Sequence, residues 1–152
     1  MAEQSESARA AALQRWADGK ATLKEVRGYS DEELFSIART AYYFFYQGKI
    51  SEARTLFQGL YAVNPLDAYV AKALGVVEHA AGNAQGALAA FDVALKIAPQ
   101  DPAAYVGRAE VKLSLGQKSQ AVDDLKRALG LSREEPDLKA KISALLSALT
   151  RR

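Results

Sequence analysis

The chain has 152 residues, the length of one ordinary domain, and 49% of them are apolar, which is enough to form a hydrophobic core. Its 20 basic and 18 acidic residues leave a formal net charge of +2, with both signs interspersed, so the composition argues against a nucleic-acid-binding surface. The absence of cysteine excludes disulfides and thiolate metal sites, and the single histidine, His79, supplies too few ligands for a zinc site.

The first 29 residues predict an N-terminal helical extension. From Ser5 to Ala17 the sequence favours helix, and Leu13 and Trp16 belong to a weak apolar stripe. A short second helix is expected from Thr22 to Arg27, ending at Gly28. Because this stripe is too narrow to be satisfied by packing on the repeats alone, we expect a weak homodimer in which Leu13 and Trp16 take part.

Residues 30–133 contain a pattern that returns every 34 residues. The repeated landmarks are a glycine, an alanine, a large apolar residue and a proline, the last replaced by arginine in the third copy: Gly48, Gly82 and Gly116; Ala53, Ala87 and Ala121; Phe57, Phe91 and Leu125; Pro65, Pro99 and Arg133. This period, with these residue types at these offsets, is typical of the tetratricopeptide repeat, a pair of helices. One pair cannot bury its apolar face alone, so the copies are expected to stack.

We therefore expect an all-α fold, a right-handed α-solenoid of three tetratricopeptide repeats at about residues 34–65, 68–99 and 102–133. The paired helices are expected at Asp31–Gln47 with Ser51–Val63, Leu66–Ala81 with Ala84–Ile97, and Pro102–Leu115 with Ser119–Leu131. In the first pair, Ile37, Ala41 and Phe44 share one helical face and are expected in the core. Residues 134–152 predict a C-terminal capping helix, from Asp137 to Leu149, which gives the open end of the stack a polar outer surface.

No catalytic constellation is visible in the sequence. His79 has no neighbouring nucleophile pattern, and the glycines are isolated turn residues, not a phosphate-binding loop. Asp123 and Asp124 are expected to be solvated charges on the outer part of a helix. We therefore expect no enzyme activity, no cofactor and no metal. The N-terminus lacks a signal-peptide core, and the most hydrophobic run, Ala41–Tyr46, is too short to span a bilayer, so we expect a soluble protein. The absence of cysteine fits a reducing cytoplasm.

The run Tyr42–Tyr46 holds five consecutive aromatic residues, more than one face of a helix can bury. Phe44 is at the core offset, and Tyr43 is expected to pack on the N-terminal segment. The other rings either cover a helix supplied by the N-terminal region or form a binding surface, which contiguous exposed aromatics more often mark. In the second interpretation, the inner, concave side of the stack binds an extended apolar peptide. Its expected residues are Ala38, Tyr42, Phe45 and Tyr46 in the first repeat, Tyr69, Lys72, Val76 and His79 in the second, and Val106 and Glu110 in the third.

This expected surface has few charges. Tetratricopeptide domains that clamp a C-terminal carboxylate need Lys and Asn in the first helix of the first repeat, and further basic residues in the third. Here those positions hold Ala38, Tyr42, Ala103 and Gly107. A carboxylate clamp is therefore excluded.

The stretch from Trp16 through Gly48, with its connector DGKATLKEV followed by YSDEELFSIARTAYYFFYQGKISEARTLF, resembles the class II chaperones of bacterial type III secretion, the LcrH/SycD type. The layout of N-terminal helices, three repeats and a C-terminal helix is similar over nearly the whole chain. The resemblance implies a cytoplasmic chaperone that holds an extended segment near the N-terminus of a translocator protein in its concave groove, with apolar pockets for proline and leucine. The alternative is a scaffold or adaptor in a pilus or cell-envelope assembly.

Overall fold

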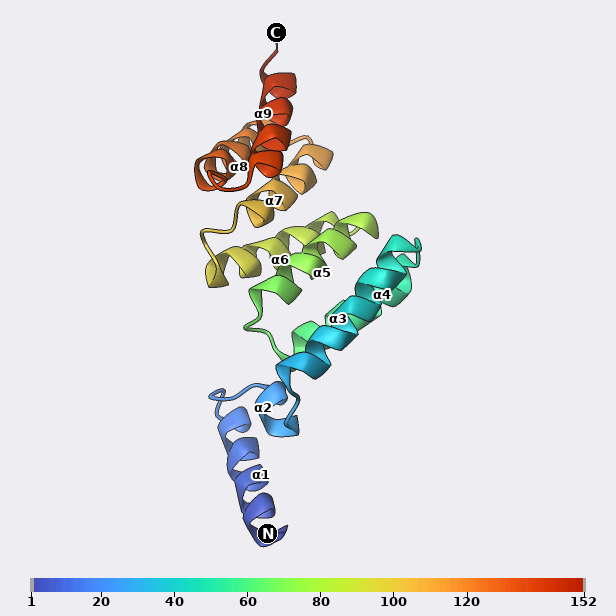
Figure 1. Cartoon of the computed structure of the whole chain (residues 1–152), viewed down its shortest axis with the longest axis vertical. Helices are drawn as coiled ribbons and strands as arrows, with labels where there is room; N and C mark the ends of the chain where they lie inside the picture. Colours follow the sequence, from blue (N-terminus) through green and yellow to red (C-terminus); the bar gives the residue numbers. More distant parts are fainter. Residues whose placement is uncertain (1, 152) are drawn as a thin grey trace. The chain divides into compact units, whose positions relative to one another are not determined.

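The computed structural model describes residues 2–151, and this part of the chain is helical apart from short connections (Figure 1). Its nine helices are α1 (Ala2–Ala17), α2 (Leu23–Arg27), α3 (Asp31–Tyr46), α4 (Ile50–Val63), α5 (Ala68–Ala80), α6 (Ala84–Ile97), α7 (Pro102–Ser114), α8 (Lys118–Leu131) and α9 (Pro136–Thr150). The all-α prediction is confirmed, and every expected helix is present with bounds that shift by only a few residues. Among these helices, none has both the length and the hydropathy that crossing a membrane requires.

Contacts between helices divide the chain into two compact units, one up to Leu66 and the other from Asp67 onward. Helices α1 to α4 make up the first, the N-terminal unit, and α5 to α9 make up the second, the C-terminal unit. The boundary therefore follows the first expected repeat. The division expected from the sequence, at 1–29, 30–133 and 134–152, stays a prediction.

Side chains cap two helices of the N-terminal unit. Thr22 and Ser30 each form a capping box, in which the hydroxyl accepts a hydrogen bond from the backbone three residues on, and that residue's carboxylate accepts one from the cap. At the start of α3, the Ser30 N–H donates to Glu33 Oε2 at 2.8 Å. Helices α3 and α4 form a hairpin whose turn residue, Gly48, has a φ of 76°. This left-handed conformation is the one expected of the repeated turn glycine.

The core of the N-terminal unit lies between α3 and α4. Ala41 and Ala53 are fully buried, and their small side chains let the two helices approach closely. Phe57 is fully buried and Leu60 nearly so, and with Ala53 they form the buried face of α4. Helix α1 packs on α2, and α2 packs on α4. The N-terminal extension thus contacts the repeat through its second helix.

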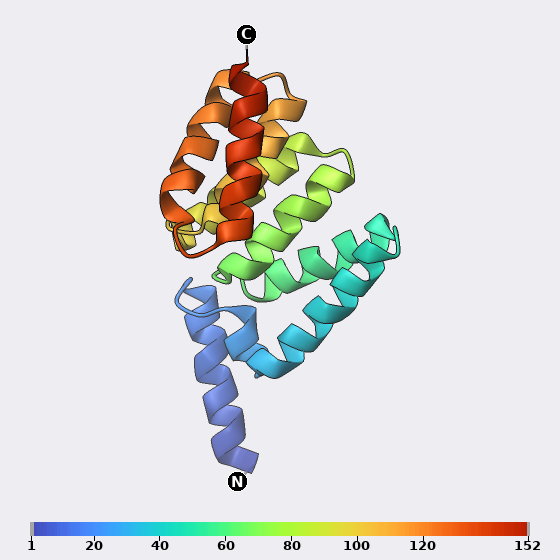
Figure 2. The ribbon, with the colours of Figure 1, turned by 45° about the horizontal axis from the view of Figure 1, so that its top comes forward.

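The C-terminal unit consists of two helix pairs, α5 with α6 and α7 with α8, followed by α9, which packs on α8 (Figure 2). Phe91 of α6 fills the space between α5 and α7. A Cβ atom added at Gly75 would lie 2.9 Å from its ring, and one added at Gly107 would lie 2.4 Å from it. The Phe91 side chain is 1% exposed. This large apolar landmark of the repeat therefore fills the gap between neighbouring helix pairs.

Helix α9 covers the apolar end of the C-terminal unit. Ile142 is fully buried in one cluster with Leu125 and Ala128 of α8, and three partly buried leucines of α9 pack around it: Leu138, Leu145 and Leu149. These four α9 residues share one face, while Lys139 and Lys141 are exposed. The expected capping helix is therefore present.

One expectation about the outer surface is wrong. Asp123 is exposed as expected, but Asp124 is only 5% exposed. Its carboxylate accepts hydrogen bonds from Arg108 Nη2 at 2.7 Å, Arg108 Nε at 2.9 Å and Lys112 Nζ at 2.8 Å. Arg108 also donates to Asp92 at 2.9 Å. Burial raises the pKa of Asp124, but the hydrogen bonds from Arg108 and Lys112 outweigh burial and hold this pKa below its usual value.

Candidate peptide-binding surface

The aromatic run of α3 forms a connected cluster at the C-terminal half of the helix. Tyr42 meets the buried Phe57 of α4 edge to face, with ring centroids 5.0 Å apart, and stacks on Tyr46 at 6.2 Å. Phe45 meets Tyr46 edge to face at 5.6 Å. Tyr42 and Phe45 are partly buried, whereas Tyr46 is 79% exposed. The cluster is thus anchored in the core at one end and open to solvent at the other.

Tyr43 does not pack on the N-terminal segment, so that expectation is wrong. Its side chain is 62% exposed and contacts the ring of Phe44 at a centroid distance of 6.0 Å. The physical reason is the placement of the extension, because α2 packs on α4. Phe44 is partly buried, and Lys49 Nζ lies 5.6 Å from its ring centre. The ring of Tyr43 therefore remains part of the accessible surface of α3.

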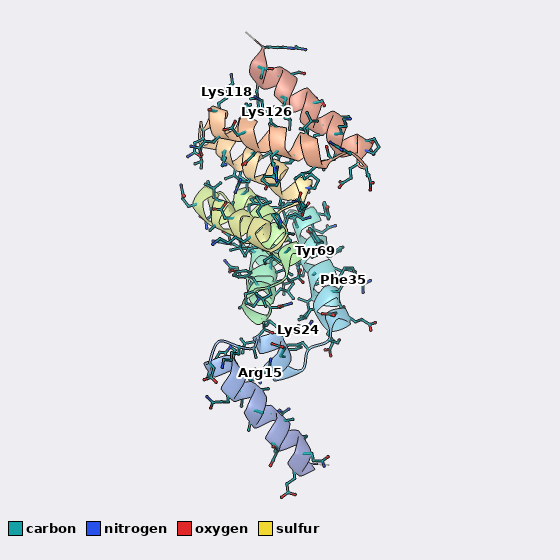
Figure 3. The ribbon with its side chains drawn as sticks, turned by 90° about the vertical axis from the view of Figure 1, so that its left-hand side faces the viewer. Arg15, Lys24, Phe35, Tyr69, Lys118 and Lys126 are labelled. Carbon is teal, nitrogen blue, oxygen red and sulfur yellow. The ribbon has the colours of Figure 1, made fainter. Side chains whose placement is uncertain are left out.

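An exposed face of α3 adds residues that the sequence analysis did not assign. We call it the α3 stripe and define it as Glu32, Phe35, Arg39, Tyr43 and Tyr46, which follow one another at helical spacings of three or four residues. Phe35, labelled in Figure 3, is 55% exposed. The Arg39 guanidinium lies 5.6 Å from the centre of its ring. The same spacing is visible in the sequence. The repeat offsets alone do not reveal it, because they describe the buried faces of the helices.

In the C-terminal unit, the expected binding residues of α5 are partly accessible. Tyr69 is 42% and Val76 is 39% exposed, and His79 is partly buried (Figure 3 labels Tyr69). Lys72 is held in an ion pair, with its Nζ 2.7 Å from Asp101 Oδ2. On α7, Glu110 is likewise paired, because its Oε1 lies 2.9 Å from Lys141 Nζ of α9. The charged members of the expected set are therefore already engaged within this unit.

Two expected binding residues belong to the core. Ala38 is 2% exposed and Val106 is 4% exposed. Val106 lies in the cluster with Leu125 and Ile142, where α9 helps to cover it. The expectation that Ala38 and Val106 line an open surface is therefore wrong. The offsets of the repeat place them correctly along their helices but do not reveal what covers them.

Ile37 also departs from its expected place in the core. It is 38% exposed and lines an apolar depression of about 230 Å³ between α3 and α4, together with Leu34, Leu56 and Val63. Tyr29, from the connection between α2 and α3, lies at its edge. The depression forms at the ends of α3 and α4 opposite to Gly48, and Gly59 of α4 also lines it.

Comparison with family models identifies the repeats. Two models, both of the tetratricopeptide repeat, match residues 38–102 and residues 78–149. The chain is a tetratricopeptide-repeat protein. No curated protein sequence matches it at a significant level.

Solved structures share the fold of this tetratricopeptide-repeat protein over most of its length. The type III secretion translocator chaperone SycD of Yersinia enterocolitica is 23% identical, with a TM-score of 0.80, covering 84% of this chain and 98% of its own. A type III secretion complex from Aeromonas hydrophila is 23% identical, with a TM-score of 0.82, covering 91% and 94%. PcrH from Pseudomonas aeruginosa is 25% identical, with a TM-score of 0.75, covering 80% and 95%. The chain therefore has the fold of these translocator chaperones.

The accessible side chains of this tetratricopeptide-repeat protein are mainly of the kind that binds a partner through apolar contacts. Aromatic rings dominate the open surface of α3, and Arg39 is the cation among them. Within residues 2–151, no three His, Asp or Glu side chains are grouped closely enough to hold a metal ion. Rings of this kind bury large apolar areas with little loss of conformational freedom, which favours recognition of a peptide.

Proposed function

We propose that this protein is a cytoplasmic chaperone that binds an extended, apolar segment of a type III secretion translocator protein and keeps that protein soluble and export-competent. The role is one of binding and needs neither catalysis nor a cofactor. The proposal includes a weak homodimer through Leu13 and Trp16 of α1, whose side chains are 48% and 47% exposed.

Support for the class of client comes from proteins with the same fold. One structure of Yersinia enterocolitica SycD contains a peptide of the translocator YopD, at 24% identity and a TM-score of 0.73. Two structures of PcrH contain the chaperone-binding regions of PopD and PopB. Those partners belong to those proteins, and they indicate the kind of segment that we propose for this one.

The observation that carries the proposal is the open aromatic surface of α3. Tyr46 and Tyr43 are more than half exposed, and Tyr42 and Phe45 continue the surface toward the core. A helical repeat offers no free strand edge, so a bound peptide must gain its affinity from side chains. Exposed aromatic rings on a rigid helix are suited to bind the side chains of such a peptide. In the C-terminal unit, we propose Tyr69, Val76 and His79 as further contacts.

The experiment is titration calorimetry of the full chain against peptides from the N-terminal regions of translocator proteins, with one-to-one stoichiometry expected. Tyr46→Ala should weaken binding by about 2 kcal/mol, as expected for an aromatic anchor. Phe45→Ala should cost as much. Tyr42→Ala is a less specific probe, because Tyr42 also packs on Phe57. Asp123→Ala, on the exposed side of α8, is the matched control and should bind like the wild type.

Circular dichroism must show that each variant keeps its helices. If Tyr46→Ala and Phe45→Ala are folded and bind like the wild type, α3 is not the site. If no translocator peptide binds the wild-type protein, the chaperone proposal fails. A scaffold in a pilus or cell-envelope assembly would then be the better hypothesis.

A further inference from the structure

The α3 stripe contains a cationic side chain, Arg39, that forms no ion pair within residues 2–151. Arg39 is exposed, and its guanidinium makes a cation–π contact with the ring of Phe35. Within residues 2–151, Arg39 takes part in none of the ion pairs, whereas Arg108 of the C-terminal unit contacts two carboxylates. An exposed arginine that packs on an aromatic ring and forms no ion pair within the described part of the chain is well suited to bind a carboxylate from outside the chain.

Charges of both signs follow each other along this face. Two shallow depressions meet at Arg39 and Ser36. One, of about 650 Å³, also involves Glu32, Glu33 and Phe35. The other, of about 290 Å³, is completed by Thr40 and Tyr43. The face is therefore acidic near the start of α3, cationic at its middle and aromatic toward its end.

This order excludes simple anions as the occupant. Glu32 and Glu33 lie in the same depression as Arg39, so they would repel a free phosphate or an anionic lipid surface. A peptide can instead place charges of opposite sign against each part of the face. The rise of an α-helix is 1.5 Å per residue, so Glu32 and Arg39 are separated by about 10 Å along the axis, and Arg39 and Tyr46 by about the same distance. A peptide in the polyproline II conformation has three residues per turn and rises about 3.1 Å per residue, so side chains three residues apart lie on the same side, about 9 Å from one another.

We propose that the bound segment carries an acidic side chain three residues from its apolar anchor and a basic side chain three residues beyond the acidic one. Arg39 pairs with the acidic side chain, Glu32 faces the basic one, and Tyr43 and Tyr46 contact the apolar anchor. This inference rests on the proposed function, because it specifies the segment that α3 recognises. The charges determine which segment binds, and the aromatic rings supply most of the affinity.

The test uses the full chain and two synthetic peptides of the same composition, labelled for fluorescence anisotropy. The first has a leucine–proline anchor, aspartate three residues further on and lysine three residues beyond that. The second has the aspartate and the lysine exchanged. The wild type should bind the first peptide about fivefold more tightly, as expected when the exchange removes two exposed ion pairs worth about 0.5 kcal/mol each. Arg39→Glu should remove this preference, because both facing positions are then acidic, and Arg39→Gln should reduce it while Glu32 still favours the lysine.

Lys126→Glu is the matched control, because it makes the same change of charge at an exposed position of α8 (Figure 3). It should leave the preference unchanged, and high salt should weaken the preference of the wild type. Equal binding of both peptides by the wild type, or a preference that survives Arg39→Glu, overturns this inference and leaves the proposed function intact. Failure of both peptides and of translocator peptides to bind overturns both.

Discussion

The two units use the surfaces of their helices differently. In the C-terminal unit, Lys72 pairs with Asp101, Glu110 pairs with Lys141, and Arg108 holds the buried Asp124. In the N-terminal unit, α3 instead leaves a row of aromatic residues and one arginine in solvent, and within residues 2–151 that arginine, Arg39, forms no ion pair.

This difference indicates that the paired side chains serve stability, whereas the exposed rings of α3 serve recognition of a partner. Side chains of the C-terminal unit that are paired or enclosed contribute to holding its helices together, so removing them should destabilise the fold. Exposed rings of α3 contribute little to the fold, so removing them should affect only binding. Four changes test or refine this distinction.

The largest effect is expected at Asp124. Asp124→Ala leaves Arg108 and Lys112 close together without the carboxylate that they share, and breaking a buried pair in this way typically costs about 3–5 kcal/mol. Asp123→Ala on the same helix is exposed and should stay within about 0.5 kcal/mol of the wild type. Urea denaturation followed by circular dichroism measures both. Equal stabilities of the two variants would show that the network is not structural.

The next effect is expected at Gly107. A Cβ at this position would lie 2.4 Å from the ring of Phe91, so Gly107→Ala should destabilise by about 1–3 kcal/mol through overpacking. Gly130→Ala is the matched control, because a Cβ there meets no atom within 4 Å. It should be neutral or slightly stabilising, since alanine favours helix by about 1 kcal/mol over glycine. A neutral Gly107→Ala in thermal denaturation would contradict the close packing of Phe91.

A smaller effect should follow pH. The pKa of Asp124 in the folded protein is lower than its ordinary value of 3.8, so its contribution to stability is complete above that value and is lost as pH falls through the folded pKa. The difference in unfolding free energy between wild type and Asp124→Asn should be constant from about pH 7 to pH 5 and should shrink below about pH 4. Denaturant curves at several pH values give this difference. A difference in unfolding free energy that grows on acidification would contradict the lowered pKa of Asp124.

The smallest effect is expected in the N-terminal unit. Leu13 and Trp16 are about half exposed, so changing both to serine should leave the fold intact and weaken any association. Light scattering over a range of concentrations should show a lower average mass for the double variant than for the wild type. Equal monomeric masses for both proteins at high concentration would exclude the dimer. A loss of helicity would show that α1 depends on these two side chains.

The repeating pattern was sufficient to predict the helices of the repeats, because each repeated residue determines structure near its own position. Gly48 ends a helix in the left-handed conformation, and Ala53 and Phe57 are one turn apart on a buried face. Partners from other helices were not predictable in this way. Asp124 is buried because Arg108, sixteen residues earlier, reaches it from α7, and no spacing within α8 indicates this contact.

The candidate site was predicted in part for the same reason. The sequence indicated the aromatic surplus on α3, and the structure exposes Tyr46. It did not indicate that Tyr43 is also exposed, because this depends on the extension packing on α4 instead of α3. Val106 has the right offset for a surface position, yet α9 helps to cover it. Offsets fix the direction of a side chain on its helix, but only the assembled helices decide whether it stays accessible.

The position of Phe91 has a consequence for how related sequences can diverge. Its ring occupies the volume of two missing side chains, one at Gly75 and one at Gly107. A larger residue at either glycine position can be accommodated only if residue 91 becomes smaller at the same time. These three positions should therefore change together among homologues, although each is sixteen residues from the next along the chain. Single changes at one of them should be rare, whereas a paired exchange of bulk between position 91 and a neighbouring glycine position should be tolerated.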